Sequence, residues 1–183
     1  MTTTLKGNWN YPTLVRFGAG RIVELPDHCR ALGMQRPLLV TDAGLAALPM
    51  IASARKTCRD AGLECEVFSD VQANPVETNV TAGVAAFRRG GHDGVKPFGG
   101  GSPPDTPKAL ALKVGQNPPI WDFEDREDWY TRVNVAGMAP VVAVPTTAGT
   151  GSEVGRASVI TDLRDHTKKI IFHAKMMPGI VLE

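Results

Sequence analysis

Short apolar runs alternate with segments of helical period along most of this chain, and that alternation restricts the fold more than any other feature. The apolar runs lie at 37–41, 63–68, 93–98 and 141–144, and helical patterns fill 51–61, 77–89 and about 103–114. Strands that are apolar on both faces belong inside a parallel sheet, and the segments between them are long enough for crossover helices. We therefore expect an α/β fold with a Rossmann-like, open, mostly parallel sheet and helices on both faces.

Two stretches depart from this alternation. Residues 116–135 carry Trp121, Trp129 and an acidic cluster, and we interpret them as a surface excursion whose aromatic side chains need a surface to pack on. Residues 156–173 predict two strands around a polar turn, which is a C-terminal β-hairpin. No internal repeat or domain boundary is visible, so residues 1–183 are expected to form one domain.

Composition excludes several classes of protein. Twenty Lys and Arg residues against nineteen Asp and Glu give a net charge of +1, so no basic excess indicates a nucleic acid or membrane partner. No apolar run approaches the roughly 20 residues that span a bilayer, and the first residues lack a signal-peptide pattern. The three cysteines fit neither a zinc site nor a disulfide framework, which favours reduced thiols and a cytoplasmic protein.

The apolar run 93–98 leads into Gly99-Gly100-Gly101-Ser102 and then into a helical segment. Glycine lets the backbone approach a ligand closely, and a helix start presents unpaired N–H groups and the positive end of the helix dipole. Ser102 is a candidate N-cap for that helix. The loop predicts a phosphate site, with a tight turn that binds nothing as the alternative; its spacing is neither G-x-G-x-x-G nor a Walker loop.

A second loop of this kind follows the run 141–144. Residues 146–152, Thr-Thr-Ala-Gly-Thr-Gly-Ser, hold four hydroxyl side chains and two glycines in seven positions. Polar ligands of open α/β sheets meet such groups at the carboxyl ends of the strands. Two loops of this composition in one sheet favour a dinucleotide, which has two phosphates and two riboses. A phosphate-binding protein without a nicotinamide is the alternative.

Asp42 ends the first apolar run. A carboxylate at this place could accept hydrogen bonds from an adenosine ribose and repel a 2′-phosphate. The alternative is a helix cap or a loop acid.

These loops carry a resemblance to a known family. The strings Val40-Thr41-Asp42, Asn74-Pro75, Phe98-Gly-Gly-Gly-Ser-Pro-Pro-Asp105 and Pro145-Thr-Thr-Ala-Gly-Thr-Gly-Ser-Glu-Val154 resemble the signatures of the iron-containing (group III) alcohol dehydrogenases. The resemblance runs from about residue 11 to about residue 178, and the threonine loop is its most specific part.

The resemblance implies an oxidoreductase that uses NAD, and NADP less readily, to interconvert small alcohols with aldehydes or ketones. It implies that Asp42 favours NAD and that a group of loop residues holds the pyrophosphate and the nearby ribose. Further threonines would line the adenine and ribose side, and two later residues would approach the nicotinamide half. In chain order, the positions that match cofactor-contacting residues are Asp42, Asn74, Gly100, Gly101, Ser102, Thr146, Thr147, Thr150, Val159 and Lys168.

The same resemblance implies a C-terminal all-helical domain in which one Asp and three His hold Fe²⁺ or Zn²⁺. We expect these ligands and the substrate wall to lie outside residues 1–183, so that this chain binds NAD and has no catalytic residue, metal ligand or turnover by itself. An apolar face that lacks its helical partner favours association, so a homo-oligomer such as a dimer is expected. The histidines show neither H-x-x-H nor H-x₃-H spacing, and we interpret each as a surface or loop residue: His28, His92, His166 and His173.

Four residues depart from a regular pattern. Lys96 and Pro97 should interrupt a buried strand, because proline lacks a ladder donor and a buried ammonium is costly. Pro107 falls early in a helix, where proline is unfavourable past the first turn. Gly155 replaces the threonine that usually follows Glu-Val in the family, which removes a hydroxyl that would contact the cofactor.

Other functions remain open from the sequence. The chain could be a non-catalytic dinucleotide-binding or assembly module. It could also belong to a related enzyme, such as a glycerol-1-phosphate or maleylacetate-type reductase, although the threonine loop argues against this.

Overall fold

The computed structural model describes residues 6–10, 12–100 and 105–183. The strands are β1 (Lys6–Asn10), β2 (Leu14–Gly18), β3 (Pro37–Val40), β4 (Glu66–Phe68), β5 (Gly94–Pro97), β6 (Val142–Ala143), β7 (Ala157–Asp162), β8 (Thr167–Phe172) and β9 (Ile180–Leu182). The helices are α1 (Leu25–Ala31), α2 (Ala43–Ala46), α3 (Pro49–Asp60), α4 (Glu77–Arg89) and α5 (Asp105–Lys113).

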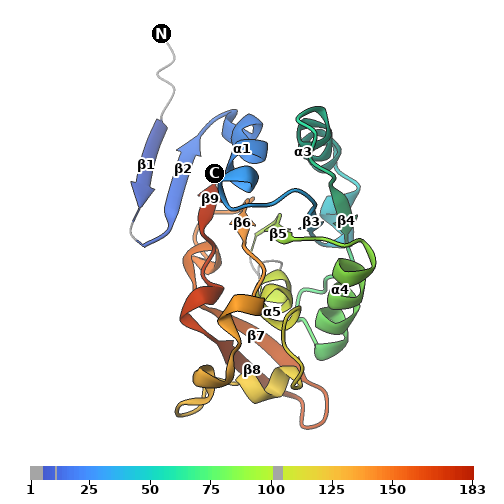
Figure 1. The fold of residues 1–183 in the computed structure, drawn as a ribbon, viewed down its shortest axis with the longest axis vertical. Coiled ribbons are helices and arrows are strands. Elements are labelled where there is room, and N and C mark those ends of the chain that lie inside the picture. The colour runs from blue at the N-terminus through green and yellow to red at the C-terminus, as the bar shows by residue number, and fades with distance from the viewer. Residues whose placement is uncertain (1–5, 11, 101–104) are drawn as a thin grey trace.

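Parallel strands form the centre of the molecule (Figure 1). One group has the order β4-β3-β5 and a second has the order β1-β2-β9-β6, and within them only β1 runs antiparallel to its neighbour. Parallel bridges from Val95 to Val141 and from Phe98 to Val144 join β5 to the chain around β6. The predicted open, mostly parallel sheet is confirmed, and strands β1, β2 and β9 extend it where the sequence predicted none.

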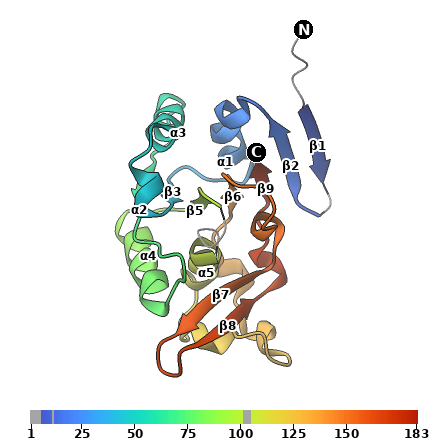
Figure 2. The same ribbon diagram turned by 180° about the vertical axis from the view of Figure 1, so that it is seen from behind.

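Two hydrophobic clusters lie on opposite faces of the sheet. Leu38 and Val40 of β3 pack with α4 and α5, whereas Leu39, between them, packs with α1 and α3. Successive side chains of a strand point to opposite faces, so one short apolar strand supplies both clusters. Helices therefore cover both faces, as predicted (Figure 2).

The predicted β-hairpin is formed by β7 and β8, which pair antiparallel. Asp162 at the end of β7 is buried and accepts hydrogen bonds from Arg164 and Lys169, and these bonds hold the turn. The excursion 116–135 packs against this unit. Within it, Phe123 is fully buried, and Trp121 donates from Nε1 to Glu77 Oε2 over 2.9 Å.

The expectation that Lys96 and Pro97 interrupt their strand is wrong. Both lie within β5 and are buried. Pro97 needs no amide partner, since the ladder continues through Phe98 N–H to Val40 O at 2.9 Å and through Val144 N–H to Pro97 O at 2.8 Å. Pro107, the third residue of α5, likewise leaves that helix continuous to Lys113.

Replacing Phe123 by Ala is expected to lower the free energy of unfolding by about 3 to 5 kcal/mol, because it opens a cavity in the core. Urea unfolding followed by circular dichroism measures the change. Leu163→Ala, at a side chain that is 55% exposed, is the control and should cost less than about 0.5 kcal/mol. Equal losses for the two variants would contradict the placement of 116–135 against the core.

Candidate functional site

The carboxyl ends of β3, β5 and β6 lie at one edge of the sheet, because these strands run parallel. Asp42 follows β3, Gly99 and Gly100 follow β5, and Thr146 follows β6. The structure therefore brings the ends of the predicted glycine and threonine loops to one place. Gly101 and Ser102 lie outside the described residues.

Gly100 and Thr147 lie in close contact. A Cβ atom added to Gly100 would be 1.7 Å from Thr147 Oγ1, so the two loops approach closely only because residue 100 is glycine. Gly149 and Gly151 have φ angles of 106° and 65°, a region that favours glycine. The amides of Thr147, Ala148 and Gly149 donate no hydrogen bond within residues 6–10, 12–100 and 105–183. This edge thus presents N–H groups and hydroxyls together.

A buried lysine fastens the threonine loop to α5. Lys108 Nζ donates to the carbonyl and the hydroxyl of Ser152, each at 3.1 Å, and to Ala157 O at 2.5 Å. Asp105 accepts from Ser152 Oγ at 3.2 Å and lies 3.3 Å from Lys108 Nζ. Burial lowers the pKa of Lys108, and the charge of Asp105 partly offsets this effect.

Sequence reasoning missed Lys108. Its only sequence signal is a single charge inside the apolar run of α5, where a lysine would ordinarily mark a solvent-facing position. Lys108 is buried because the threonine loop folds back over α5, and that contact depends on the tertiary structure.

Asp42 serves as the N-cap of α2. Its Oδ1 accepts from the Leu45 amide at 2.9 Å, so the alternative interpretation of Asp42 as a helix cap is confirmed. The side chain is half-buried and its second oxygen makes no hydrogen bond among the described residues.

Asn74 is exposed after β4. The start of α4 is held by Asn79 rather than by Asn74, through hydrogen bonds to Val76 N and Asp70 O.

Val159 and Lys168 lie on the outward face of the β7–β8 hairpin. Lys168 pairs with Thr161, whereas the alternate residues Ser158, Ile160 and Asp162 are buried. The hairpin packs on α5, and Ser158 Oγ donates to Asp105 O at 2.5 Å. These two predicted residues thus share a face with each other but belong to a different element from the two loops.

Thr150 lies in the exposed threonine loop, where its Oγ1 accepts from Ser152 N at 3.5 Å.

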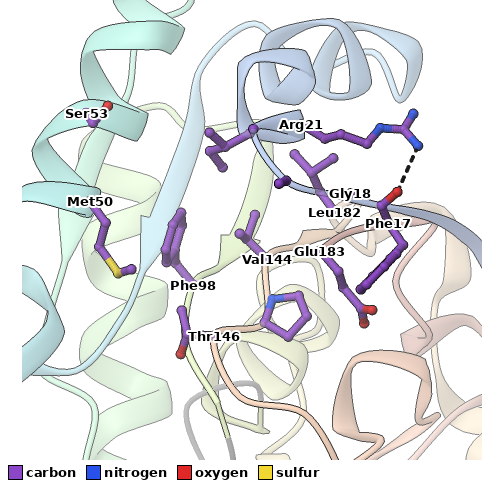
Figure 3. Close-up of a pocket in the computed structure, with 14 residues that line it drawn as sticks. Phe17, Gly18, Arg21, Met50, Ser53, Phe98, Val144, Thr146, Leu182 and Glu183 are labelled. Atoms are coloured by element: carbon purple, nitrogen blue, oxygen red, sulfur yellow. Dashed lines mark hydrogen bonds between the residues drawn. The ribbon is translucent and has the colours of Figure 1, made fainter. Parts of the chain in front are cut away.

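A cavity of about 410 Å³ opens at the same edge, beside the threonine loop. Phe17 and Phe98 supply aromatic walls, Val144 and Leu182 supply aliphatic ones, and Thr146 lies at its border (Figure 3). Residues 18–20 form a further wall. The space can take a flat, mostly apolar group with a polar atom directed at Thr146.

The histidines do not form a metal site. Among the residues that the structure describes, no three His, Cys, Asp or Glu side chains converge. His92 and His173 lie in loops as predicted, but both are buried: His92 Nδ1 lies 2.8 Å from Arg36 O, and His173 Nδ1 accepts from Lys175 N. The described residues therefore do not fit a bound iron or zinc ion. No described helix is both long and apolar enough to cross a membrane.

Comparison with known proteins accords with this arrangement. The family model described as iron-containing alcohol dehydrogenase matches residues 12–182. The chain belongs to this family. It is 35% identical over 171 residues to a 1,3-propanediol dehydrogenase of Klebsiella pneumoniae, a match that covers 92% of this chain and 43% of the relative. It is 33% identical over 175 residues to an NAD-dependent methanol dehydrogenase of Bacillus methanolicus, which covers 96% of this chain and 45% of the relative.

Solved structures of the family share the fold. A 1,3-propanediol oxidoreductase superposes with a TM-score of 0.84 at 32% identity, covering 100% of this chain and 45% of that one. A sulfoacetaldehyde reductase from Bifidobacterium kashiwanohense in complex with NAD⁺ gives a TM-score of 0.81 at 27% identity, covering 100% of this chain and 46% of that one. This chain thus spans less than half the length of the relatives it matches.

Replacing Lys108 by Met is expected to speed amide hydrogen exchange about tenfold in residues 152–155, because the loop loses its bonds to a charged donor, worth about 1.5 kcal/mol. Exchange followed by mass spectrometry measures this. Lys113→Met is the matched control, since Lys113 lies on the same helix and donates to Gln116 O instead. Unchanged exchange in the Lys108 variant would contradict the role of Lys108 as the tether.

Proposed function

We propose that residues 1–183 form the NAD-binding domain of a metal-dependent alcohol dehydrogenase. The observation that carries the proposal is the contact of Gly100 with Thr147 at the carboxyl edge of the sheet, where ligands of open α/β sheets bind. A glycine loop and a hydroxyl loop that meet there can surround a pyrophosphate and its ribose from two sides.

The pyrophosphate is proposed to lie over the glycine loop. Gly100, with Gly101 and Ser102, would offer backbone N–H groups, and Thr147 and Thr150 would offer hydroxyls. Asn74, exposed beyond β4, would donate from its amide side chain at the border of the same edge.

We assign the adenine ring to the cavity beside Thr146. Its walls are mainly apolar and include two phenylalanines, which suits a flat heteroaromatic ring, and Thr146 can bond to a ring nitrogen. Asp42 would accept from the adenosine ribose and repel a 2′-phosphate, which favours NAD over NADP. In this proposal, one oxygen of Asp42 caps α2 while the other meets the ribose.

The nicotinamide half is proposed to lie along the outward face of the hairpin, next to Val159 and Lys168. When bound, NAD accepts a hydride from an alcohol or returns one to an aldehyde or ketone as NADH. This chain's contribution is to orient the dinucleotide, and the tether of Lys108 holds the threonine loop in place for that task. The family's metal ion and the substrate wall would come from outside residues 1–183, so the isolated chain should bind NAD without turnover. We further propose a cytoplasmic homo-oligomer.

The proposal predicts saturable binding of NAD to this chain in a calorimetric titration. NADP should bind at least tenfold more weakly. ADP-ribose should compete with NAD, whereas inorganic phosphate should not. Absence of binding by a chain that circular dichroism shows to be folded would contradict the proposal, and competition by phosphate alone would favour the phosphate-binding alternative.

Asp42→Asn should raise the affinity for NADP about tenfold and leave NAD binding close to its original value. The amide keeps an oxygen that can cap α2 and accept a hydrogen bond from the ribose. It removes the negative charge whose repulsion of a 2′-phosphate is worth about 1.4 kcal/mol. Titration of both cofactors measures the ratio. Asp42→Gly is the companion variant, which should lose the ribose bond as well. An unchanged preference for NAD over NADP in both variants would contradict the proposed role of Asp42.

Gly155→Thr should tighten NAD binding about fivefold, since it restores a hydroxyl whose hydrogen bond is worth about 1 kcal/mol. The position has room: an added Cβ would lie 3.4 Å from Ser152 O and 3.7 Å from Lys108 Nζ, and the φ angle of −90° suits a branched residue. Gly155→Val is the matched control without a hydroxyl. Equal affinities of the two variants would show that the hydroxyl makes no bond.

A further inference from the structure

Three side chains from separate elements meet on the face of the sheet that α1 and α3 cover. Lys96 extends from β5, and its ammonium group lies 3.1 Å from Cys58 Sγ on α3 and 3.0 Å from Cys65 Sγ, directly before β4. Lys96 and Cys58 are 0% exposed, and Cys65 is 5% exposed. Because both sulfurs contact one nitrogen, the two cysteines are close to each other as well.

The ammonium group of Lys96 lies among thiols. Within the described part of the chain, no Asp or Glu forms an ion pair with it. A buried ammonium needs an anion nearby, and a thiolate is the one anion that these contacts can supply. The two thiols are therefore suited to share one negative charge.

Cys65 is the better placed of the two to carry that charge, because it is 5% exposed and Cys58 is 0% exposed. The neighbouring Cys58 thiol lowers the pKa of Cys65 against the effect of burial, and the charge of Lys96 lowers it further. The Cys65 side chain, together with burial, raises the pKa of Cys58. Burial acts to lower the pKa of Lys96, but the negative charge of the cysteine pair outweighs it, and the pKa of Lys96 is raised.

We propose that Cys65 and Cys58 form a thiol oxidation site, in which a hydroperoxide oxidises Cys65 and Cys58 resolves the product as an intrachain disulfide. A thiolate beside a cation is the reactive form of cysteine, and a second thiol in contact is the usual resolving group. The proposed cofactor site does not use these residues.

The reaction balances with the hydroperoxide as the only oxidant. The Cys65 sulfur attacks the terminal oxygen, the O–O bond breaks, and the departing oxygen takes a proton from solvent and leaves as water or an alcohol. The Cys58 sulfur then attacks the sulfur of the sulfenic acid. The S–S bond forms, the S–O bond breaks, and the hydroxyl leaves as water with the proton of Cys58. Two thiols lose two electrons, and the hydroperoxide gains them.

Access to the site comes from the edge of the sheet. Cys65 precedes β4, which is the terminal strand of the β4-β3-β5 group, and its neighbours Glu64 and Glu66 are exposed. Cys29 lies in the same hydrophobic cluster but makes no hydrogen bond to Lys96. Burial raises the pKa of Cys29 to about 11, so it serves as an internal control.

Oxidation should also weaken β5. A disulfide carries no charge, so Lys96 loses its anion inside the core, on the strand that leads into Gly99 and Gly100. The midpoint temperature of the oxidised chain is therefore expected to fall by several degrees, and reduction with a dithiol should restore it.

The test treats the 183-residue chain with a small excess of hydrogen peroxide, removes the excess with catalase, and alkylates the remaining thiols in denaturant. Tryptic peptides are then identified by mass spectrometry. Cleavage after Arg59 separates the two cysteines, so a disulfide joins two peptides. We expect a Cys58–Cys65 linked pair with Cys29 alkylated. Oxidation of Cys29 at the same rate, a sulfinic acid without a linked pair, no oxidation, or a link to Lys96 would overturn the proposal.

Lys96→Met is the deciding variant, and circular dichroism checks its fold. An apolar residue of similar length should be tolerated in the buried position, because replacing a buried charge by a hydrophobic residue is often neutral. Formation of the linked pair should slow at least tenfold, whereas alkylation of Cys29 in the native chain should not change. Cys58→Ser should instead stop at the sulfenic or sulfinic acid of Cys65. An unchanged rate in Lys96→Met would overturn the role of the ammonium.

Discussion

The parallel pairing of β5 with β3 on one side and with the chain around β6 on the other is the constraint on which the rest of the structure depends. It sends the glycine loop and the threonine loop to one edge of the sheet and lets Gly100 and Thr147 touch. If β5 and the chain around β6 ran antiparallel, the two loops would lie at opposite edges. The candidate cofactor site is thus a direct consequence of strand direction.

Two lysines are buried close to these strands, and their ammonium groups have different hydrogen-bonding partners. Lys108 on α5 finds carbonyls, a hydroxyl and a carboxylate, so its burial holds a loop in place. Lys96 on β5 finds two thiols, so its burial favours a reactive thiolate. A buried charge constrains its surroundings because it must find partners there, and the chemistry of those partners decides what the site can do.

Much of the fold could be predicted from the pattern of apolar residues. The helix at 77–89, the hairpin at 157–172 and the central strands follow from periodicity, and strand β5 forms despite its lysine and proline. Strands β1, β2 and β9 could not be predicted in this way. They are short, and β9 forms by pairing with β2 and β6. The residues of β2 lie more than a hundred positions before those of β9 in the chain. Such pairing leaves no local signal.

The sequence by itself determined which residues are candidates for a dinucleotide site, because glycines, hydroxyls and Asp42 directly follow apolar strands, and the side-chain chemistry needs no fold to be recognised. Only the tertiary structure decided which of them meet. It placed Gly100 against Thr147, put Asp42 on the cap of α2, left Val159 and Lys168 on a separate hairpin, and drew Lys96 and two cysteines together from three elements. The physical reason is that burial and contact arise between segments far apart in the chain, and no spacing along the sequence encodes them.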